Sequence, residues 1–145
     1  VHIAQALVSL ANVADYEIIL IDPRDHFATK SRFPNCKIIN EWPDEALSKF
    51  NLDKSSHLVT LTHDPKIDDL ALIFCMKKNI GYIGSLGSKK THNKRCERLI
   101  EKGFNEIELS KIHAPIGLDI KAKTPAEIAA SILAEIINYR RNNYD

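Results

Sequence analysis

The sequence predicts an α/β fold, in which a parallel β-sheet carries helices on both faces. Short apolar runs rich in β-branched residues alternate with longer segments whose apolar residues recur every three or four positions. Polar or glycine-containing breaks follow several of these runs, at residues 22–24, 63–65 and 84–88. Strands that alternate with helices in this way form parallel sheets that helices cover on both sides. At 145 residues the chain is long enough for one domain with its own core.

The first half of the chain supplies a helix, two strands and a loop. Residues 1–13 place alanine, leucine, isoleucine and valine on one broad face, which predicts a helix already under way at the first residue. Residues 16–21 (YEIILI) form a β-rich apolar run that ends at Asp-Pro-Arg, and residues 36–39 offer a second short strand. The polar segment between them, residues 25–35, is expected to be an irregular loop.

The middle of the chain continues the alternation. Acidic residues after Pro43 and the spacing of Ala46, Leu47 and Phe50 predict a short helix over residues 44–52. Residues 57–62 (HLVTLT) predict a strand that His-Asp-Pro ends, and helical spacing then resumes over residues 66–79.

The second half begins with a short strand over residues 80–83 and a glycine-containing turn over residues 84–88. A basic helix follows from Lys89 to Lys102 and stops at Gly103. A short helix over residues 105–112 has Asn105 as its cap.

The last part of the chain is a loop and a long helix. Residues 113–120 (HAPIGLDI) contain too much proline and glycine for a plain strand and predict a loop with a short extended end. Thr124-Pro125-Ala126-Glu127 then opens the final helix, with a capping threonine and a proline at its first position.

Composition narrows the classes of function. The 20 basic and 19 acidic side chains leave a net charge of +1, which argues against a general nucleic-acid or membrane-surface binder. No apolar run reaches the length that crosses a bilayer, and the first residues lack the charged lead of a secretory signal. We therefore expect a cytoplasmic protein that forms a single domain over residues 1–145.

The cysteines suggest neither a disulfide framework nor a zinc site, because they are three in number, widely spaced and without a C-x-x-C pair. Cys75 lies in an apolar helical pattern and is expected to be an inert core thiol. Cys96 has basic neighbours that favour a thiolate, but a reactive Cys96 is the weaker of the two interpretations. The sequence thus predicts no metal ligands and no catalytic residues.

The turn before the basic helix predicts an anion-binding site. Ser88 is placed to cap the helix that begins at Lys89, and the free amides of its first turn point back at the turn with the positive end of the helix dipole. A phosphate or carboxylate fits such a position. The cations of this helix are Lys89, Lys90, Lys94, Arg95 and Arg98. Many helices carry such residues as a solvated outer face, and for the lysines alone that interpretation is favoured. The glycine turn before them gives a functional role equal weight.

Three loops are expected to form one ligand site. In parallel sheets, the loops that follow the carboxyl ends of the strands meet in a common crevice. This places residues 22–24, His63 with Asp64, and residues 84–88 around one site, with residues 113–119 closing it from one side.

Each candidate in these loops has a plainer interpretation. Asp22 either binds a ribose hydroxyl or accepts hydrogen bonds within its own turn before Pro23, and the turn role is favoured because no dinucleotide-binding glycines are visible. Arg24 either holds a phosphate or forms a surface ion pair. His63 and Asp64 either act as a base or ligand pair or simply begin a helix before Pro65.

The remaining histidines are weighed in the same way. By its spacing, His92 is a surface residue that faces the same side of its helix as Ser88 and Arg95. His26 and His57 are expected to be structural or surface residues.

Five segments together resemble the C-terminal Rossmann-like domain of the XdhC/CoxI family, accessory proteins for molybdenum-cofactor enzymes such as xanthine dehydrogenase. They are VHIAQAL, LIDPRDHFATKSRFP, LTHDPKIDDLAL, YIGSLGSKKTHNKR and IHAPIGLDIKAKTPAEIAASILAEII, and they span nearly the whole chain in the family's order. The resemblance implies a maturation factor that binds the molybdopterin form of the cofactor, assists its sulfuration and delivers it to a partner molybdoenzyme. The expected cofactor-binding residues are Asp22, Arg24, His63, Asp64, Gly84, Ser85, Leu86, Gly87, Ser88, Lys89, His113 and Asp119.

The sequence departs from the family pattern at its start. Family members carry a strand and a G-A-G-H or G-A-V-H turn before the first helix, and this sequence begins at Val1, where that turn would end. We therefore expect an N-terminally truncated domain without its first strand, which normally lies in mid-sheet. The expected consequence is a gap, a sheet repaired by inward movement of residues 16–21, or a partner's segment in its place.

Two alternative functions stay open beside the maturation factor. The α/β pattern permits an NAD(P)-dependent oxidoreductase-type dinucleotide-binding domain, although no G-x-G-x-x-G is present. A ligand-free interaction module, which docks onto a dehydrogenase or forms a homodimer, is the other.

Overall fold

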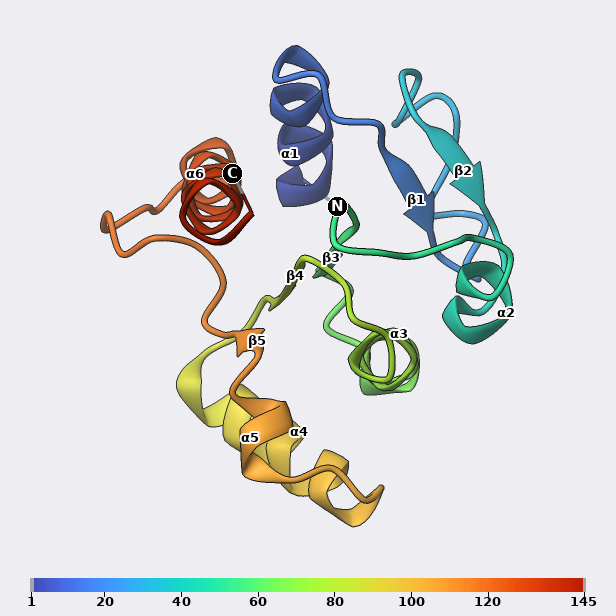
Figure 1. Ribbon diagram of the computed structural model, residues 1–145. Coiled ribbons are helices and arrows are strands. Elements are labelled where there is room, and N and C mark those ends of the chain that lie inside the picture. Colours follow the sequence, from blue (N-terminus) through green and yellow to red (C-terminus); the bar gives the residue numbers. More distant parts are fainter. Residues whose placement is uncertain (1, 145) are drawn as a thin grey trace.

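The structure is a computed structural model that describes residues 2–144, and it confirms the predicted α/β class (Figure 1). Every strand pairing in the described chain is parallel. In chain order the elements are α1 (His2–Val13), β1 (Ile19–Ile21), β2 (Lys37–Ile39), α2 (Pro43–Leu47), β3 (His57–Thr60), α3 (Pro65–Met76), β4 (Tyr82–Ser85), α4 (Lys89–Glu101), α5 (Glu106–Leu109), β5 (Ile112–His113) and α6 (Pro125–Asn143).

The strands form two separate sheets. β1 pairs with β2, and β3, β4 and β5 form the second sheet in that order. Among residues 2–144, no strand joins β1 to β3. Figure 1 shows β1 and β2 set apart from the three central strands. Residues 16–21 have not moved inward, and only Ile19–Ile21 form the strand.

Side-chain alternation along the central sheet separates two packed faces. Leu58, Ile83 and Ile112 point to a core that α2, α3, α4 and α5 cover, and its fully buried members include Leu72 and Leu99. We call this side the α3–α4 face. Neighbouring positions on the same strands point to a second cluster, which α1 and α6 cover. We call it the α1–α6 face, and Figure 1 shows α1 and α6 beside each other.

Local capping chemistry fixes where the helices begin. The side chain of Ser88 accepts from the amide of Thr91, as predicted, and Asn105 and Thr124 each close a capping box with the glutamate three residues later. Asp64 caps α3 in the same way, by accepting from the amide of Lys66. These bonds satisfy amides that the helices themselves leave without partners.

Several predicted boundaries were wrong. β4 covers Tyr82–Ser85 and not residues 80–83, α2 ends at Leu47, and His113 belongs to β5 rather than to a loop. The physical reason at β4 is close packing. A Cβ on Gly84 would lie 2.6 Å from both Ile116 Cδ1 and the Tyr82 hydroxyl, so this glycine serves contact between elements and not chain reversal. No described helix is long and apolar enough to cross a membrane.

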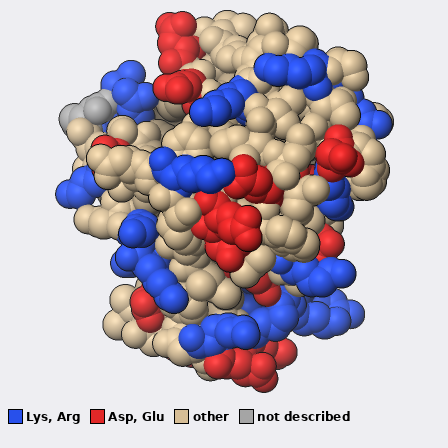
Figure 2. All heavy atoms as spheres, turned by 90° about the vertical axis from the view of Figure 1, so that its right-hand side faces the viewer, with Lys and Arg blue, Asp and Glu red and all other residues tan. Residues whose placement is uncertain are grey.

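Figure 2 shows both signs of charge on the side of the molecule that bears β1, β2 and α2, with a group of acidic side chains near the middle of the view and basic side chains gathered in its lower part. This distribution agrees with the balanced composition.

Candidate functional site

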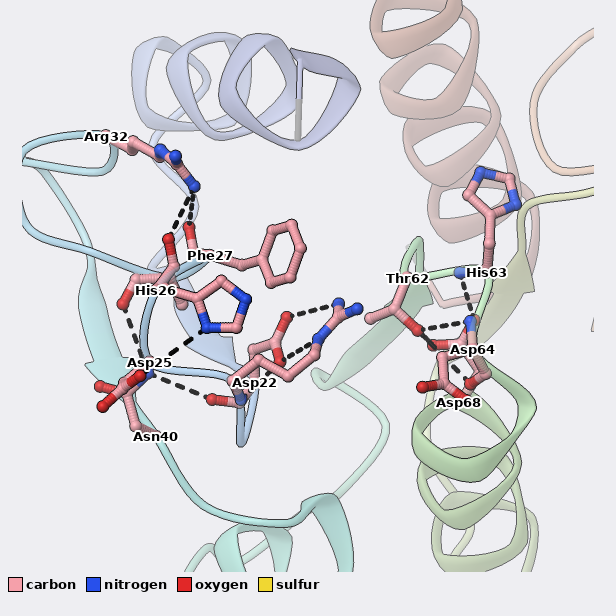
Figure 3. A network of polar contacts seen from close by, with 12 residues as sticks. Asp22, Asp25, His26, Phe27, Arg32, Asn40, Thr62, His63, Asp64 and Asp68 are labelled. Atoms are coloured by element: carbon pink, nitrogen blue, oxygen red, sulfur yellow. Dashed lines mark hydrogen bonds and ion pairs between the residues drawn. The ribbon is translucent and has the colours of Figure 1, made fainter.

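The loop after β1 is closed by a pair formed between Asp22 and Arg24 (Figure 3). The Asp22 carboxylate is buried and accepts from the Arg24 amide at 2.9 Å, from its Nε at 3.0 Å and from its Nη2 at 2.9 Å. The turn role favoured for Asp22 is therefore present, and Arg24 forms an ion pair. The hydrogen bond to Asp22 raises the pKa of Arg24. Both oxygens of Asp22 are engaged by the chain itself.

The loop after β3 is organised around the buried carboxylate of Asp68. That carboxylate accepts from the Thr62 hydroxyl at 2.6 Å and from the His63 amide at 3.2 Å. Burial raises the pKa of Asp68, and these hydrogen bonds oppose the rise. His63 has a φ of +64°, a conformation uncommon outside glycine, and the bond to Asp68 holds its amide in place.

The loops after β1 and β3 face each other, as the sequence predicts. In Figure 3 the loop that carries Asp22 lies opposite the loop that carries Thr62, His63 and Asp64. The charges of Asp64 and Asp68 are close enough to add to the rise in the pKa of Arg24. Two of the three predicted loops thus lie at one rim.

The loop after β4 joins the same region through β3. The Ser85 hydroxyl is fully buried and lies 2.5 Å from the Thr60 hydroxyl, and the Leu86 amide donates to the Thr60 carbonyl at 3.0 Å. Gly84 and Ser85 are therefore strand residues, and the prediction that they form the turn was wrong. The turn consists of Leu86, Gly87 and Ser88, where Gly87 has a φ of +137°, and Lys89 begins α4.

Arg95, one of the cations for which a solvated outer face was considered, lies beneath this turn. It is only 3% exposed. Its Nη2 donates to the Leu86 carbonyl at 3.1 Å, and its Nη1 lies 3.1 Å from His92 Nδ1. Its Nε is buried and has no hydrogen-bond partner among the described residues. The available signal was the spacing of Ser88, His92 and Arg95, which places them on one face of α4 beside the turn.

A recess of about 180 Å³ opens between α3 and α4 at this position. Its lining residues are His63, Pro65, Asp68, Asp69, Thr91, Lys94, Arg95 and Arg98. A larger hollow of about 540 Å³ lies elsewhere, beside the residues that precede β1 and β2. Because it is at the amino ends of these strands, it is away from the predicted loops. We take the smaller recess as the candidate site, since it adjoins the β3 and β4 loops and a buried cation.

His113 and Asp119 are not among the residues that line this recess. His113 stacks on Tyr82 at a ring-centroid distance of 4.7 Å, and its Nδ1 lies 3.0 Å from the Ile83 carbonyl oxygen. It therefore packs on the α1–α6 face, away from α3 and α4. Asp119 is exposed and lies 3.4 Å from Lys121 Nζ.

Cys75 is a core thiol, as predicted, and Cys96 is half-buried. Cys75 is 1% exposed, and burial raises its pKa to about 12. Cys96 lies with its Sγ 3.4 Å from His92 Nε2, and burial raises its pKa although Arg95 acts in the opposite direction. A thiolate at Cys96 is disfavoured on this ground. Within residues 2–144, no group of three or more His, Cys, Asp or Glu side chains is arranged to hold a metal ion.

Comparison with known proteins places this geometry in a family. Residues 1–136 match the family model described as the XdhC Rossmann domain. The chain is 35% identical over 138 residues to a Bacillus subtilis protein named as part of a probable xanthine dehydrogenase, and 29% identical over 137 residues to the Escherichia coli molybdenum cofactor insertion chaperone PaoD. These alignments cover 92% and 94% of this chain but only 40% and 37% of the relatives.

A solved structure agrees with the sequence relatives. The crystal structure of a Bacillus halodurans protein named a xanthine dehydrogenase superposes with a TM-score of 0.83 at 30% identity, over 99% of this chain and 41% of that one. The family model, the relatives and the superposition all extend over nearly the whole sequence. The chain belongs to the XdhC Rossmann domain family.

Proposed function

We propose that this chain is part of a maturation factor that binds a molybdopterin-type cofactor and helps its sulfuration or insertion into a xanthine-dehydrogenase-like molybdoenzyme. The observation that supports the proposal is that the loops after β1 and β3 lie opposite each other, while the turn after β4 lies over the buried cation of Arg95. A relative named as a molybdenum cofactor insertion chaperone supports the same role. The residues proposed to contact the cofactor are Arg24, His63, Asp64, Leu86, Gly87, Ser88 and Lys89, with Asp22 holding Arg24 in place.

The chemistry of the site suits storage and release rather than turnover. The first amides of α4, at Lys89 and Lys90, precede any intrahelical acceptor and are available to an anionic group. Hydrogen-bond donors on the backbone and on Arg24 bind such a group without forming a covalent bond, so the cofactor remains releasable to a partner enzyme. Sulfuration within this complex is part of the proposal.

An NAD(P)-binding role finds less support. A dinucleotide site of this fold uses a carboxylate after the second strand to accept from a ribose hydroxyl. Here both oxygens of Asp22 already accept from Arg24. A ribose would first have to displace a buried ion pair.

The test is to release molybdenum cofactor from a xanthine-dehydrogenase-type enzyme under anaerobic conditions and to measure its binding to the full chain by calorimetry. Gly87→Val is expected to weaken binding about tenfold or more, because a Cβ there would lie 3.0 Å from Thr91 Cγ2 and 3.7 Å from Arg95 Nη2. Gly103→Val is the matched control, since Gly103 also has a positive φ but no atom within 4 Å of its Cβ position. Equal affinity of the two variants, or binding of NAD in place of the cofactor, would contradict the proposal.

A further inference from the structure

We propose that the recess between α3 and α4 is an oxyanion site for a phosphate monoester, with Arg95 as its buried charge and Lys94 as its exposed one. Neither residue belongs to the loops from which the proposed function was argued. The inference rests on that function only for the identity of the molecule that carries the phosphate.

Arg95 is a buried cation without an anionic partner in the described part of the chain. It is 3% exposed, and no carboxylate of residues 2–144 forms an ion pair with it. Its guanidinium contacts are a carbonyl oxygen and a histidine nitrogen, which carry no compensating charge, and its Nε has no partner there. Burying an arginine in this state is costly, and an unsatisfied buried group in a native protein calls for an explanation. A bound anion supplies one.

The walls of the recess leave positive charge uncompensated. Arg98 donates to Asp69 through Nε at 2.7 Å and Nη2 at 3.2 Å, so these two side chains neutralise each other. Asp68 is held by Thr62 and the His63 amide, within electrostatic range of Arg95 but outside contact distance. The Lys94 side chain is exposed and forms no hydrogen bond with any residue of 2–144. Once the Arg98–Asp69 pair is set aside, the recess is lined by two cations, Lys94 and Arg95, and by one carboxylate, Asp68.

The size and position of the recess suit a phosphate. At about 180 Å³, it has the volume of roughly six water molecules, which fits a phosphate group with its bridging waters and not a whole pterin. The turn that the sequence predicts to bind an anion lies directly beside it. Arg95 donates to the Leu86 carbonyl within that turn, and a Cβ on Gly87 would lie 3.7 Å from Arg95 Nη2. A phosphate in the recess would thus lie between His63 of the β3 loop and the turn after β4.

The plainer interpretation is that Arg95 only braces the turn. A brace needs the bonds to Leu86 and His92, but it does not need the recess, the second cation or an available Nε. The two interpretations differ at Lys94, which lines the recess and braces nothing.

The experiment is titration of the full chain with inorganic phosphate, followed by amide chemical shifts and calorimetry. Phosphate is expected to shift the amides of α4 around Thr91 and Lys94. Arg95→Gln is expected to weaken phosphate binding about tenfold or more, and Lys94→Gln several-fold, because each removes a charge-assisted contact. Lys102→Gln is the matched control, since it removes one positive charge at the far end of the same helix.

The outcomes separate the two proposals. Equal effects of Lys94→Gln and Lys102→Gln would overturn the oxyanion site, and Lys94→Gln decides the matter even if Arg95→Gln does not fold. Competition of phosphate with extracted molybdenum cofactor that is several-fold weaker in Lys94→Gln supports the site. Cofactor that binds the wild type and Lys94→Gln equally overturns it and leaves the proposed function standing. If phosphate binds as expected but the chain binds no cofactor, the oxyanion site stands and the proposed function is overturned.

Discussion

The two faces of the central sheet differ in how the chain pairs their charged side chains. On the α1–α6 face, the Tyr82 hydroxyl donates to Glu135 Oε1 at 2.6 Å, and the same oxygen accepts from the Gly117 amide at 3.1 Å. On the α3–α4 face, Arg95 is buried with its Nε unused and no anion of residues 2–144 in contact. The α1–α6 face also holds one ring nitrogen without a partner among the described residues, His57 Nε2, but His57 lines neither of the two recesses described above. Polar groups that are satisfied within the chain stabilise the fold, whereas donors left over beside a recess point to a ligand. We expect mutations on the first face to change stability and those at the recess to change binding.

The largest expected effect tests whether apolar packing on the α3–α4 face stabilises the fold. Leu99 is 0% exposed, and Leu99→Ala is expected to lower the free energy of unfolding by about 2 to 5 kcal/mol, because it leaves a cavity beneath α4. Its neighbour Ile100 is 50% exposed, so Ile100→Ala is the control and should cost well under 1 kcal/mol. Urea denaturation measures both. Similar losses would mean that α4 is not anchored as described.

A pair of glycines tests how tightly the α1–α6 face is packed. Gly117 and Gly103 have nearly equal φ values, +98° and +100°, but a Cβ on Gly117 would clash with the Ser131 hydroxyl whereas one on Gly103 meets no atom within 4 Å. Gly103→Ala should cost only the strain of its backbone, about 1 kcal/mol. Gly117→Ala should cost about 1 to 3 kcal/mol more, from overpacking against α6. Thermal unfolding of the two variants measures the difference. Equal losses of unfolding free energy would show that α6 shifts to make room for the added methyl group.

The contrast between the faces also explains which features were predictable. Helix starts at Ser88, Asn105 and Thr124 were predicted correctly, because capping depends on residues three positions apart. The turn role of Asp22 is equally local. Parallel pairing followed from the alternation of strands and helices.

Features that depend on distant contacts were missed. Gly84 looked like a turn residue, but Ile116, which lies more than thirty positions further along the chain, requires it to be a close-packed strand residue. Arg95 could not be told apart from the solvated cations of its helix. It binds the Leu86 carbonyl, and residue spacing does not reveal that the turn containing Leu86 folds over α4. His113 was placed in a loop at the crevice, yet pairing of β5 with β4 turns its ring onto Tyr82. Each of these errors concerns a tertiary contact rather than a local propensity.

A smaller effect tests the division of roles directly. Tyr82→Phe removes a donor from Glu135, and it is expected to cost about 1 to 2 kcal/mol of unfolding free energy. A double-mutant cycle with Glu135→Gln measures how much of that loss belongs to the pair. Phosphate affinity should not change in either variant, because both residues lie on the α1–α6 face. A loss of phosphate binding would break the separation between the two faces.

The smallest expected effect concerns His57, whose ring is packed edge-on against Tyr16 and near Tyr82 and whose Nε2 has no hydrogen-bond partner among the described residues. Burial, and then the charge of Arg140, lower the pKa of His57 in the folded protein. In the unfolded chain, His57 takes up a proton near the ordinary histidine pKa of about 6.5, whereas in the folded chain it does so only at lower pH. The free energy of unfolding should therefore fall as the pH drops through about 6.5. Burial and then Arg95 lower the pKa of His92 in the same direction, so His57→Phe should make this fall shallower without abolishing it. Thermal unfolding between about pH 7.5 and pH 5 measures the slope. An unchanged slope in His57→Phe would mean that the acid sensitivity comes from the α3–α4 face, through His92, and that the α1–α6 face contributes none of it.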